Sequence, residues 1–310
     1  MITCVSLNPS IDRTLAVPRL VPGGLNRVAS QTDVAAGKGV NVALAAAALG
    51  ERAACIGFMY REGARLFGER LAGAGVAGDF VMCEGAVRVN VKVLDEERGE
   101  ITELNSSGAP VTEAQLAQMA ELARRYAEKS DVMILSGSLP PGCSADYYRV
   151  LGEVARDVGC RVILDADGDR LRLGLEAKPF LIKPNRHELE LLTGRRLDTI
   201  DALLSAALGC VRGGVGVAAV SMGGDGALIT DGRTALRAPG LKVEIRSTVA
   251  AGDSMIAGLA AGFGRGYSLE DAFRLGVAAA TARCATPPDE LISEELCARF
   301  AQELKVEKMA

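Results

Sequence analysis

The chain has 310 residues, a formal net charge of −4 and no run of basic residues. This length is enough to bury a large core, and the slightly acidic balance argues against general nucleic-acid binding. The single histidine, His187, excludes histidine-rich metal sites, and no uninterrupted apolar run is long enough to suggest a membrane span.

Short apolar strands alternate with helical patterns along the chain. In chain order the predicted strands cover residues 2–8, 53–58, 131–137, 161–166, 179–183 and 215–221. The predicted helices between them cover residues 39–50, 112–129, 145–159 and 199–214. Near-continuous apolar strands separated by helices are typical of a mostly parallel sheet that is covered on both faces, so we predict an α/β fold.

Two polar-alternating segments, residues 12–34 and 87–104, interrupt this pattern. Their alternation and internal glycine turns predict antiparallel strands. Both follow a core strand, so we expect them to meet as a small sheet that serves as a lid or as a dimer contact. Because no linker or repeat is visible, we expect one domain, residues 1–310, that carries this lid.

The eight cysteines are scattered without a Cys-x-x-Cys pair, and the N-terminal sequence lacks the pattern of a signal peptide. Both features favour reduced thiols and a cytoplasmic protein. Most of these cysteines are expected to fill the core, since a free cysteine behaves as a small apolar side chain.

The sequence "AAGKGVNVA" (35–43) places Gly37, Lys38 and Gly39 directly before a predicted helix. It is not a Walker A loop, because the required first glycine and the following Ser or Thr are missing. A lysine beside two glycines at a helix start is suited to an anion. A flexible turn that caps the helix explains the same residues.

The sequence "IKPNRHELELL" (182–192) ends a strand and starts a helix. Glu188 follows Asn185 by three residues, as in a capping box. A functional interpretation has both side chains organise metal-bound water or phosphate at the end of the strand, where open α/β sheets bind ligands. "SGSLPPG" (136–142) ends another strand and brings hydroxyl groups to the same edge.

Two further glycine-rich stretches are weaker nucleotide signals. "GGVGVA" (213–218) superficially matches a dinucleotide fingerprint, but its glycines end a helix and begin a strand, which is the reverse of the required context. A nicotinamide dehydrogenase is therefore disfavoured. "SMGGDGALIT" (221–230) predicts a hairpin loop whose bare backbone could lie against a nucleotide.

Within the second lid segment, "RVNVK" (88–92) alternates so that Arg88, Asn90 and Lys92 share one face. Two positive charges on one face could clamp a phosphate group, and a merely solvated face would explain the same pattern. Asp12 lies near the other lid segment.

The sequence "TVAAGDSMIAGLAAG" (248–262) places small residues and Asp253 before an apolar helix. Asp253 either favours the positive end of the helix dipole or acts as an acid–base group beside open backbone amides. Several such turns fall at strand ends or helix starts, and each is suited to anions. Their convergence favours phosphoryl transfer, in which positioning and charge neutralisation dominate.

These motifs resemble those of the ribokinase-like (PfkB) carbohydrate kinases over nearly the whole chain. "AAGKGVNVA" is similar to the N-terminal signature of that family, "STVAAGDSMIAG" to its C-terminal signature, and Asn185-x-x-Glu188 to its N-x-x-E motif. "LNPSID", "RVNVK" and "SGSLPPG" resemble the branch that phosphorylates fructose 1-phosphate or tagatose 6-phosphate. The resemblance implies a ribokinase-like three-layer α/β/α sandwich with a small β-sheet lid.

The resemblance also implies a role for each matching residue. Asp253 would be the general base, and the amides of Ala250, Ala251 and Gly252 would form an anion hole. The sugar phosphate would be held by Asp12, Gly37, Lys38, Gly39, Asn41, Arg88, Asn90, Lys92 and Ser138. ATP would be bound by Lys183, Asn185, Ser221, Gly223, Gly226, Ala279 and Cys284.

Glu188 would serve Mg²⁺ and a phosphate-bound water. No dedicated protein cage for the metal is expected, because Mg²⁺ prefers waters and phosphates as ligands. The partner would be a small sugar phosphate. Because lids of this family often pair, a homodimer through the lid is expected.

One departure from the family pattern is Ala250, which stands where the family usually has glycine. If this position has a positive φ, an alanine there is strained by about 1 kcal/mol. The first expectation is a kinase for fructose 1-phosphate, with tagatose 6-phosphate as the alternative substrate. A non-catalytic sugar-phosphate sensor is a third possibility, although a sensor needs no general base.

Overall fold

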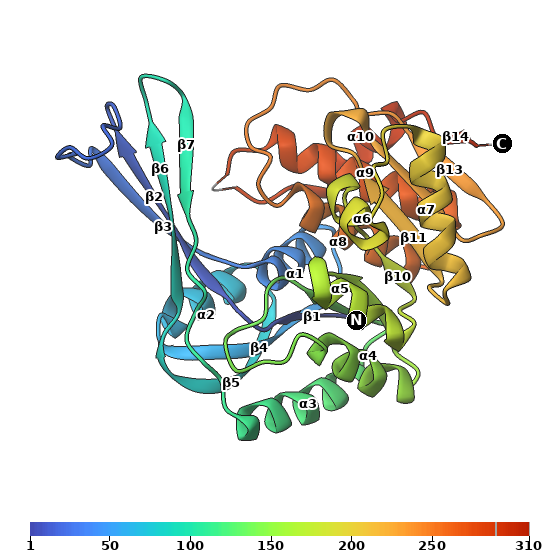
Figure 1. Cartoon of the computed structure of the whole chain (residues 1–310), viewed down its shortest axis with the longest axis horizontal. Coiled ribbons are helices and arrows are strands. Elements are labelled where there is room, and N and C mark those ends of the chain that lie inside the picture. Colours follow the sequence, from blue (N-terminus) through green and yellow to red (C-terminus); the bar gives the residue numbers. More distant parts are fainter. Residues whose placement is uncertain (289, 310) are drawn as a thin grey trace.

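Two β-sheets organise the computed structural model, which describes residues 1–288 and 290–309. A ten-stranded sheet runs through the body of the molecule, and a four-stranded sheet projects from one side of it (Figure 1). The predicted α/β architecture with a mostly parallel sheet and a small second sheet is confirmed.

The large sheet consists of β1 (Ile2–Ser6), β4 (Ala53–Glu62), β5 (Ala77–Ala86), β8 (Val132–Ser136), β9 (Arg161–Asp165), β10 (Leu181–Ile182), β11 (Val217–Ser221), β12 (Ala227–Thr230), β13 (Ala235–Ala238) and β14 (Glu307–Lys308). Their spatial order is β14-β13-β12-β11-β10-β9-β8-β1-β4-β5, and only the pairs from β11 to β14 are antiparallel. The central strands β1 and β8 are buried along their whole length, which explains their continuous apolar sequences.

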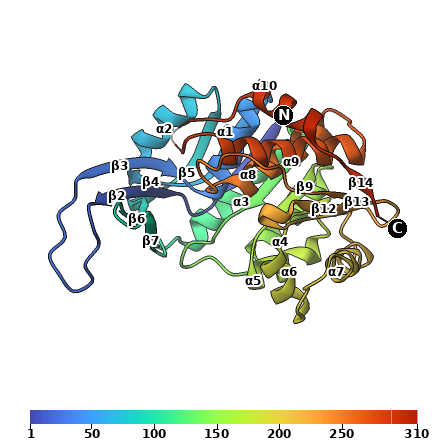
Figure 2. The ribbon, with the colours of Figure 1, turned by 90° about the horizontal axis from the view of Figure 1, so that it is seen from above.

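Helices cover both faces of this sheet (Figure 2). One layer contains α1 (Lys38–Ala48), α2 (Ala64–Gly73), α8 (Ala251–Gly264), α9 (Leu269–Ala285) and α10 (Glu294–Glu303). The other contains α3 (Glu113–Ala127), α4 (Tyr147–Asp157), α5 (Gly168–Gly174), α6 (Arg186–Thr193), α7 (Ile200–Arg212) and the single turn η1 (Leu175–Ala177). The four predicted helices correspond to α1, α3, α4 and α7, and their ends agree to within about two residues, the usual uncertainty of a helix boundary.

The small sheet is built from two hairpins that are distant in sequence. Its strands are β2 (Ser10–Val17), β3 (Ser30–Ala36), β6 (Arg88–Asp95) and β7 (Glu100–Leu104), in the order β3-β2-β6-β7. Each hairpin is antiparallel, as predicted, but β2 and β6 pair in parallel and thereby join the hairpins. The register places Asp12 opposite Asn90 and Thr14 opposite Lys92.

Two glycine-rich motifs have the predicted local structure, and one predicted strand is shorter than expected. The glycines of 213–218 lie between the end of α7 and the start of β11, so they do not open a helix. Residues 221–230 form a hairpin that contains the turn η2 (Gly223–Asp225). The strand predicted over 179–183 is reduced to Leu181–Ile182, because the flanking prolines Pro179 and Pro184 cannot donate to the ladder.

The carboxyl ends of the parallel strands point to one edge of the large sheet, where ligands bind in open α/β folds. The small sheet stands over this edge (Figure 1). No helix in the two described stretches of chain is both long and apolar enough to cross a membrane.

Candidate active site

Two neighbouring helices, α1 and α8, begin without a side-chain cap. Gly37 precedes α1 and Ala250 precedes α8, and neither provides a capping hydrogen bond from its side chain. The first amides of a helix lack partners within the helix and carry a partial positive charge. Since α1 and α8 pack against each other, the open N-termini of both helices can bind anionic groups in the same site.

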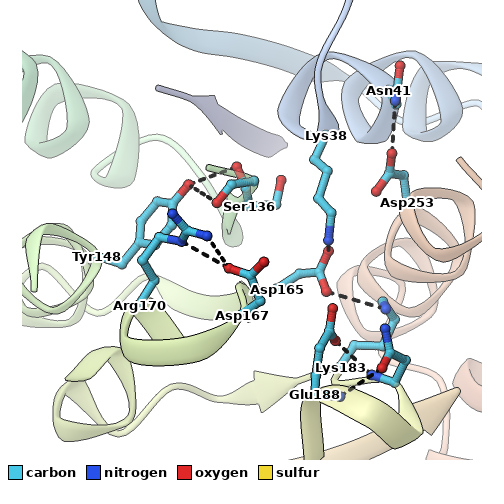
Figure 3. A network of polar contacts seen from close by, with 12 residues as sticks. Lys38, Asn41, Ser136, Tyr148, Asp165, Asp167, Arg170, Lys183, Glu188 and Asp253 are labelled. Atoms are coloured by element: carbon cyan, nitrogen blue, oxygen red, sulfur yellow. Dashed lines mark hydrogen bonds and ion pairs between the residues drawn. The ribbon is translucent and has the colours of Figure 1, made fainter. Parts of the chain in front are cut away.

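Asp253 lies in the first turn of α8 and is only 6% exposed. Its Oδ2 accepts a hydrogen bond of 2.9 Å from Nδ2 of Asn41 on α1 (Figure 3). Burial raises the pKa of the Asp253 carboxyl to about 6, while Lys38 and Asn41 act in the opposite direction. A pKa this close to neutral suits a general base.

A second buried carboxylate, Asp165, connects two lysines (Figure 3). Its Oδ2 lies 2.9 Å from Nζ of Lys38, and its Oδ1 lies 3.3 Å from Nζ of Lys183. Burial alone would raise the pKa of the Asp165 carboxyl, but Lys183 and Lys38 together hold it below its usual range. Burial likewise disfavours the charged form of Lys38, but the pKa of its ammonium group is raised because Asp165 and Asp253 outweigh burial.

Two glycines permit close approaches in this region. A Cβ atom on Gly39 would lie 2.4 Å from the main-chain oxygen of Val5, so α1 could not pack here with any side chain at that position. A Cβ atom on Gly252 would lie 3.3 Å from Nζ of Lys183. The bare Gly252 therefore leaves the Lys183 ammonium group beside the open amides of α8.

Ala250, which precedes α8, adopts a left-handed conformation with φ 63° and ψ 13°. Lys178 is the other non-glycine residue with positive φ in the described part of the chain. The left-handed region costs an ordinary L-residue about 1–2 kcal/mol. Ala250 therefore has the positive φ at which an alanine is strained.

The small sheet carries a polar cluster around Asp12. Lys92 Nζ donates to Asp12 Oδ2 at 2.8 Å, and Asn90 Nδ2 donates to Asp12 Oδ1 at 3.3 Å. Arg88 Nη1 donates to Asn90 Oδ1 at 3.3 Å, and its Nε and Nη2 donate to the main-chain oxygen of Asn8 at 3.1 and 3.0 Å. The alternating residues of 88–92 thus lie on one face, as predicted, and are paired with one another.

A cavity of about 250 Å³ lies between the small sheet and the carboxyl edge of the large sheet. Its lining consists of Ser6, Asn8, Lys38, Arg88, Asn90, Asn105, Ser136, Gly137, Ser138, Ala166 and Asp167. The volume is slightly below the ~300–1,000 Å³ of typical ligand pockets, so it suits a small polar ligand better than a nucleotide. The buried Asn8 Oδ1 and Ser136 Oγ have no hydrogen-bond partner among the described residues.

Several of the residues expected to meet ATP lie together at the ends of β10 and β11. Asn185 Oδ1 accepts from Glu188 N at 2.9 Å, and Glu188 Oε2 accepts from Asn185 N at 2.8 Å, so the predicted capping box is present. Asn185 also forms a bridge with Ser221, which precedes the turn of Gly223 and Gly226.

The remaining two residues expected near ATP, Ala279 and Cys284, lie on α9. Ala279 has no exposed surface, so it offers no contact to a ligand in this conformation. Cys284 is partly buried, and its main-chain oxygen accepts hydrogen bonds from the amides of Arg246 and Ser247 at 2.7 and 3.3 Å.

Sequence reasoning did not single out two polar residues of this region, Asp165 and Asn8, whereas Ser136 belongs to the stretch 136–142 that was expected to bring hydroxyl groups here. Asp165 ends β9 and Asn8 follows β1 by two residues, and a polar residue at the end of an apolar strand was the available signal. Asp165 in particular was absorbed into the predicted strand 161–166, where its charge interrupts the apolar run of Val162, Ile163, Leu164 and Ala166.

Comparison with known proteins relates this geometry to one family. The model of the pfkB family of carbohydrate kinases matches residues 1–289. The chain is 40% identical over 278 residues to the 1-phosphofructokinase of Rhodobacter capsulatus, covering 89% of this chain and 88% of that protein. The chain belongs to the pfkB family of carbohydrate kinases.

Other members of the pfkB family are similar to this chain over nearly its whole length. The 1-phosphofructokinase of Bacillus subtilis is 32% identical over 309 residues, covering 100% of both proteins. A solved structure of phosphofructokinase-2 from Escherichia coli in complex with fructose-6-phosphate is 30% identical, with a TM-score of 0.89 over 98% of each chain. As a pfkB carbohydrate kinase, this protein is an enzyme that transfers a phosphoryl group from ATP to a sugar.

Proposed function

We propose that the protein is a 1-phosphofructokinase, which converts fructose 1-phosphate and ATP into fructose 1,6-bisphosphate and ADP. The curated relatives named 1-phosphofructokinase support this substrate, at up to 40% identity. The observation that carries the chemistry is the buried carboxylate of Asp253 at the open start of α8. Its charged neighbour Lys38 also lines the small polar cavity.

In the proposed reaction, Asp253 accepts the proton of the sugar hydroxyl at C6. The oxygen of that hydroxyl then forms a bond to the γ-phosphorus of ATP, while the bond to the β,γ-bridging oxygen breaks and ADP leaves. The amide of Gly252 and the Lys183 ammonium group are proposed to stabilise the negative charge that develops in this step. The amide of Ala251, also expected in the anion hole, donates to the main-chain oxygen of Thr248 at 3.3 Å in this structure. Charge stabilisation of this kind is the main contribution of a protein to phosphoryl transfer.

We further propose that the cavity holds the sugar phosphate. Lys38 and Arg88 in its lining supply positive charge, while Asn90 and Ser138 supply hydrogen-bonding groups. The residues proposed to assist from its margins are Asp12, Gly37, Gly39, Asn41 and Lys92. The unsatisfied polar atoms of Asn8 and Ser136 add partners for sugar hydroxyls.

The nucleotide would bind along Asn185, Ser221, Gly223 and Gly226, outside this cavity. Mg²⁺ is proposed to accompany the nucleotide phosphates and to neutralise part of their charge. Glu188 is a partly buried carboxylate at this edge, and a single carboxylate with waters and phosphates is an ordinary environment for this ion. The chemistry of the residues present therefore fits a metal bound chiefly by its nucleotide.

We propose that the small sheet acts as a lid, that both sheets form one kinase domain, and that the lid pairs with a second copy of the chain. Exposed apolar side chains on it, including Leu25, Ile101 and Leu104, support a contact between copies. A mass in solution equal to one chain would contradict the dimer. Eight free cysteines support a cytoplasmic location.

A coupled assay with ATP tests the substrate, using fructose 1-phosphate, fructose 6-phosphate and tagatose 6-phosphate in parallel. We expect the highest kcat/KM with fructose 1-phosphate, and a preference for either 6-phosphate would overturn the proposal. The variant Asp253→Asn serves as the control for turnover. A parent protein that binds these sugars but turns over no faster than Asp253→Asn would instead be a sensor.

A further inference from the structure

A second cavity, of about 650 Å³, lies between helices α6 and α7, which pack against each other (Figure 2). This volume is within the ~300–1,000 Å³ of typical ligand pockets. Val215 precedes β11 by two residues, so the cavity reaches the amino edge of the large sheet, whereas the candidate active site lies at the carboxyl edge. We call it the α6–α7 pocket, and its lining consists of Leu175, Leu192, Thr193, Arg195, Arg196, Leu197, Ala202, Ser205, Ala206, Gly209, Cys210, Arg212, Gly213 and Val215.

The charged groups that line the α6–α7 pocket are all positive. They are Arg195, Arg196 and Arg212, with no Asp or Glu among the lining residues. Within the described part of the chain, neither Arg195 nor Arg212 has a carboxylate partner, and the nearest one to Arg196, Asp198, lies at 3.7 Å. Because guanidinium groups match the geometry of phosphate and carboxylate groups, this lining favours an anionic ligand.

The rest of the lining is largely apolar. Leu197 and Val215 are buried, while Leu175 and Leu192 are partly buried. An inorganic anion would leave these side chains without a contact, whereas an organic anion would also remove apolar surface from water, which favours binding. The chemistry of the lining therefore fits a ligand with an apolar body and an anionic group.

Gly209 leaves one wall of the pocket without a side chain. It lies inside α7, where a glycine destabilises a helix relative to alanine. A Cβ atom on Gly209 would meet only Nη2 of Arg212 within 4 Å, at 3.9 Å, which is an ordinary contact. Packing therefore does not require a glycine here, and its absence of a side chain keeps space open beside the Arg212 guanidinium group.

We propose that the α6–α7 pocket is a second binding site, which takes a small organic anion with a phosphate or carboxylate group on an apolar body. The anionic group would bind Arg195 and Arg212, and the apolar body would contact Leu197 and Val215. The pocket shares no lining residue with the cavity proposed for the sugar phosphate. It can therefore be filled while the substrates are bound, whichever sugar the enzyme phosphorylates.

The test uses 1-naphthyl phosphate as the probe. The chain contains no tryptophan, so naphthyl fluorescence can be followed without a tryptophan background. We expect the parent to bind the probe with the same Kd with and without saturating ATP. Inorganic phosphate, which lacks the apolar body, and 1-naphthol, which lacks the charge, should each bind at least about tenfold more weakly.

Substitutions of the two unpaired arginines locate the bound probe. Arg195→Ala and Arg212→Ala should each raise the Kd of the probe by about tenfold or more, because a hydrogen bond to a charged group is lost. Arg172→Ala is the matched control. Arg172, like Arg212, lies in the last turn of a helix, but it belongs to α5, pairs with Asp169 at 3.0 Å and is outside the pocket. Its substitution should leave the Kd unchanged.

Gly209→Leu fills the pocket without changing its charge. It should raise the Kd of the probe at least about tenfold, while the melting temperature stays the same or rises, because leucine favours a helix more than glycine does. Gly68→Leu is the control, since Gly68 also lies inside a helix, α2, with open space at its Cβ position. It should bind the probe as the parent does.

Four results would overturn the proposal. The parent could fail to bind the probe at millimolar concentration, ATP could compete with it, 1-naphthol could bind as tightly, or the arginine and Gly209 variants could bind like the parent. A pocket that binds a peptide rich in Glu and Leu but not the probe would be a protein-docking site instead. None of these measurements uses turnover, so they decide this proposal even if the protein does not phosphorylate fructose 1-phosphate.

Discussion

Nδ2 of Asn41 donates a 2.9 Å hydrogen bond to Oδ2 of Asp253, although the two residues are 212 positions apart in the sequence. Each lies in the first turn of its helix, α1 or α8. A hydrogen bond donated to a carboxylate favours its charged form and lowers its pKa. Asn41 therefore opposes the burial that raises the pKa of Asp253 to about 6.

Substitution of Asn41 by alanine should move the pH profile. A hydrogen bond to a charged group contributes about 1.5–3 kcal/mol, which corresponds to roughly one to two pKa units. The parent kcat/KM should fall as the pH drops through about 6, and in Asn41→Ala this fall should occur at a higher pH. The control is Asn90→Ala, because Asn90 donates to Asp12 instead. Identical pH profiles for Asn41→Ala and the parent would show that Asn41 does not lower the pKa of Asp253.

Asp253→Asn should reduce activity and increase stability. Loss of a general base costs about 10²–10⁴-fold in kcat. Raising the pKa of a buried carboxyl from 3.8 to about 6 makes its charged form cost roughly 3 kcal/mol at neutral pH.

Because the folded-state pKa is the higher one, this stability gain should be largest above pH 6 and should vanish as the pH falls towards 3.8. Denaturant unfolding of the parent and Asp253→Asn at several pH values measures it. An Asp253→Asn protein that is less stable than the parent at neutral pH would show that Asp253 is a structural anchor.

Asp165→Asn should be strongly destabilising. The substitution keeps the shape of the side chain but leaves Lys183, which is 4% exposed, without its carboxylate. Breaking one partner of a buried ion pair costs about 3–5 kcal/mol. The free energy of unfolding measures the loss, and Asp167→Asn is the control, because the exposed pair of Asp167 and Arg170 should contribute less than about 1 kcal/mol. Equal losses in the two variants would contradict a special role for Asp165.

Ala250→Gly should relieve strain with little effect on rate. Glycine removes about 1–2 kcal/mol of left-handed strain, but its greater freedom in the unfolded chain costs about 0.4–1 kcal/mol, so a net gain of between about 0 and 1.6 kcal/mol is expected. The Asp253 carboxylate and the amide of Gly252 remain, so kcat should change by less than about tenfold.

Lys178→Gly is the matched control for Ala250→Gly, since Lys178 also has a positive φ, of 51°, but lies at the end of η1. It should gain similar stability with unchanged kcat. An increase of kcat by several orders of magnitude in Ala250→Gly alone would show that the alanine impairs the site.

Features of this fold that depend only on neighbouring residues could be predicted from the sequence. The capping box of Asn185 and Glu188 depends on residues three positions apart, and the hairpin at Gly223 depends on a glycine turn between two apolar runs. The alternation of Arg88, Asn90 and Lys92 likewise follows from the period of a strand.

Features that depend on distant segments could not be read in this way. Asp165 is the last residue of a buried strand, and its importance comes from Lys38 and Lys183, which reach it from other elements. The parallel pairing of β2 with β6 also has no signal in either hairpin alone. The sign of φ at Ala250 depends on the position of α8 relative to the preceding segment. The sequence shows that an alanine with positive φ would be strained here, but only the structure shows that φ is positive.

The small sheet is less protected from solvent than the sheet over which it stands. β2 and β6 are largely half-buried and β7 is exposed, whereas β1 and β8 are buried along their whole length. Segments with few buried contacts open at a lower free energy than the core does. We therefore expect the amides of the small sheet to exchange hydrogen sooner than those of β1 and β8, so the protein can lose its sugar-binding face while its central sheet stays folded.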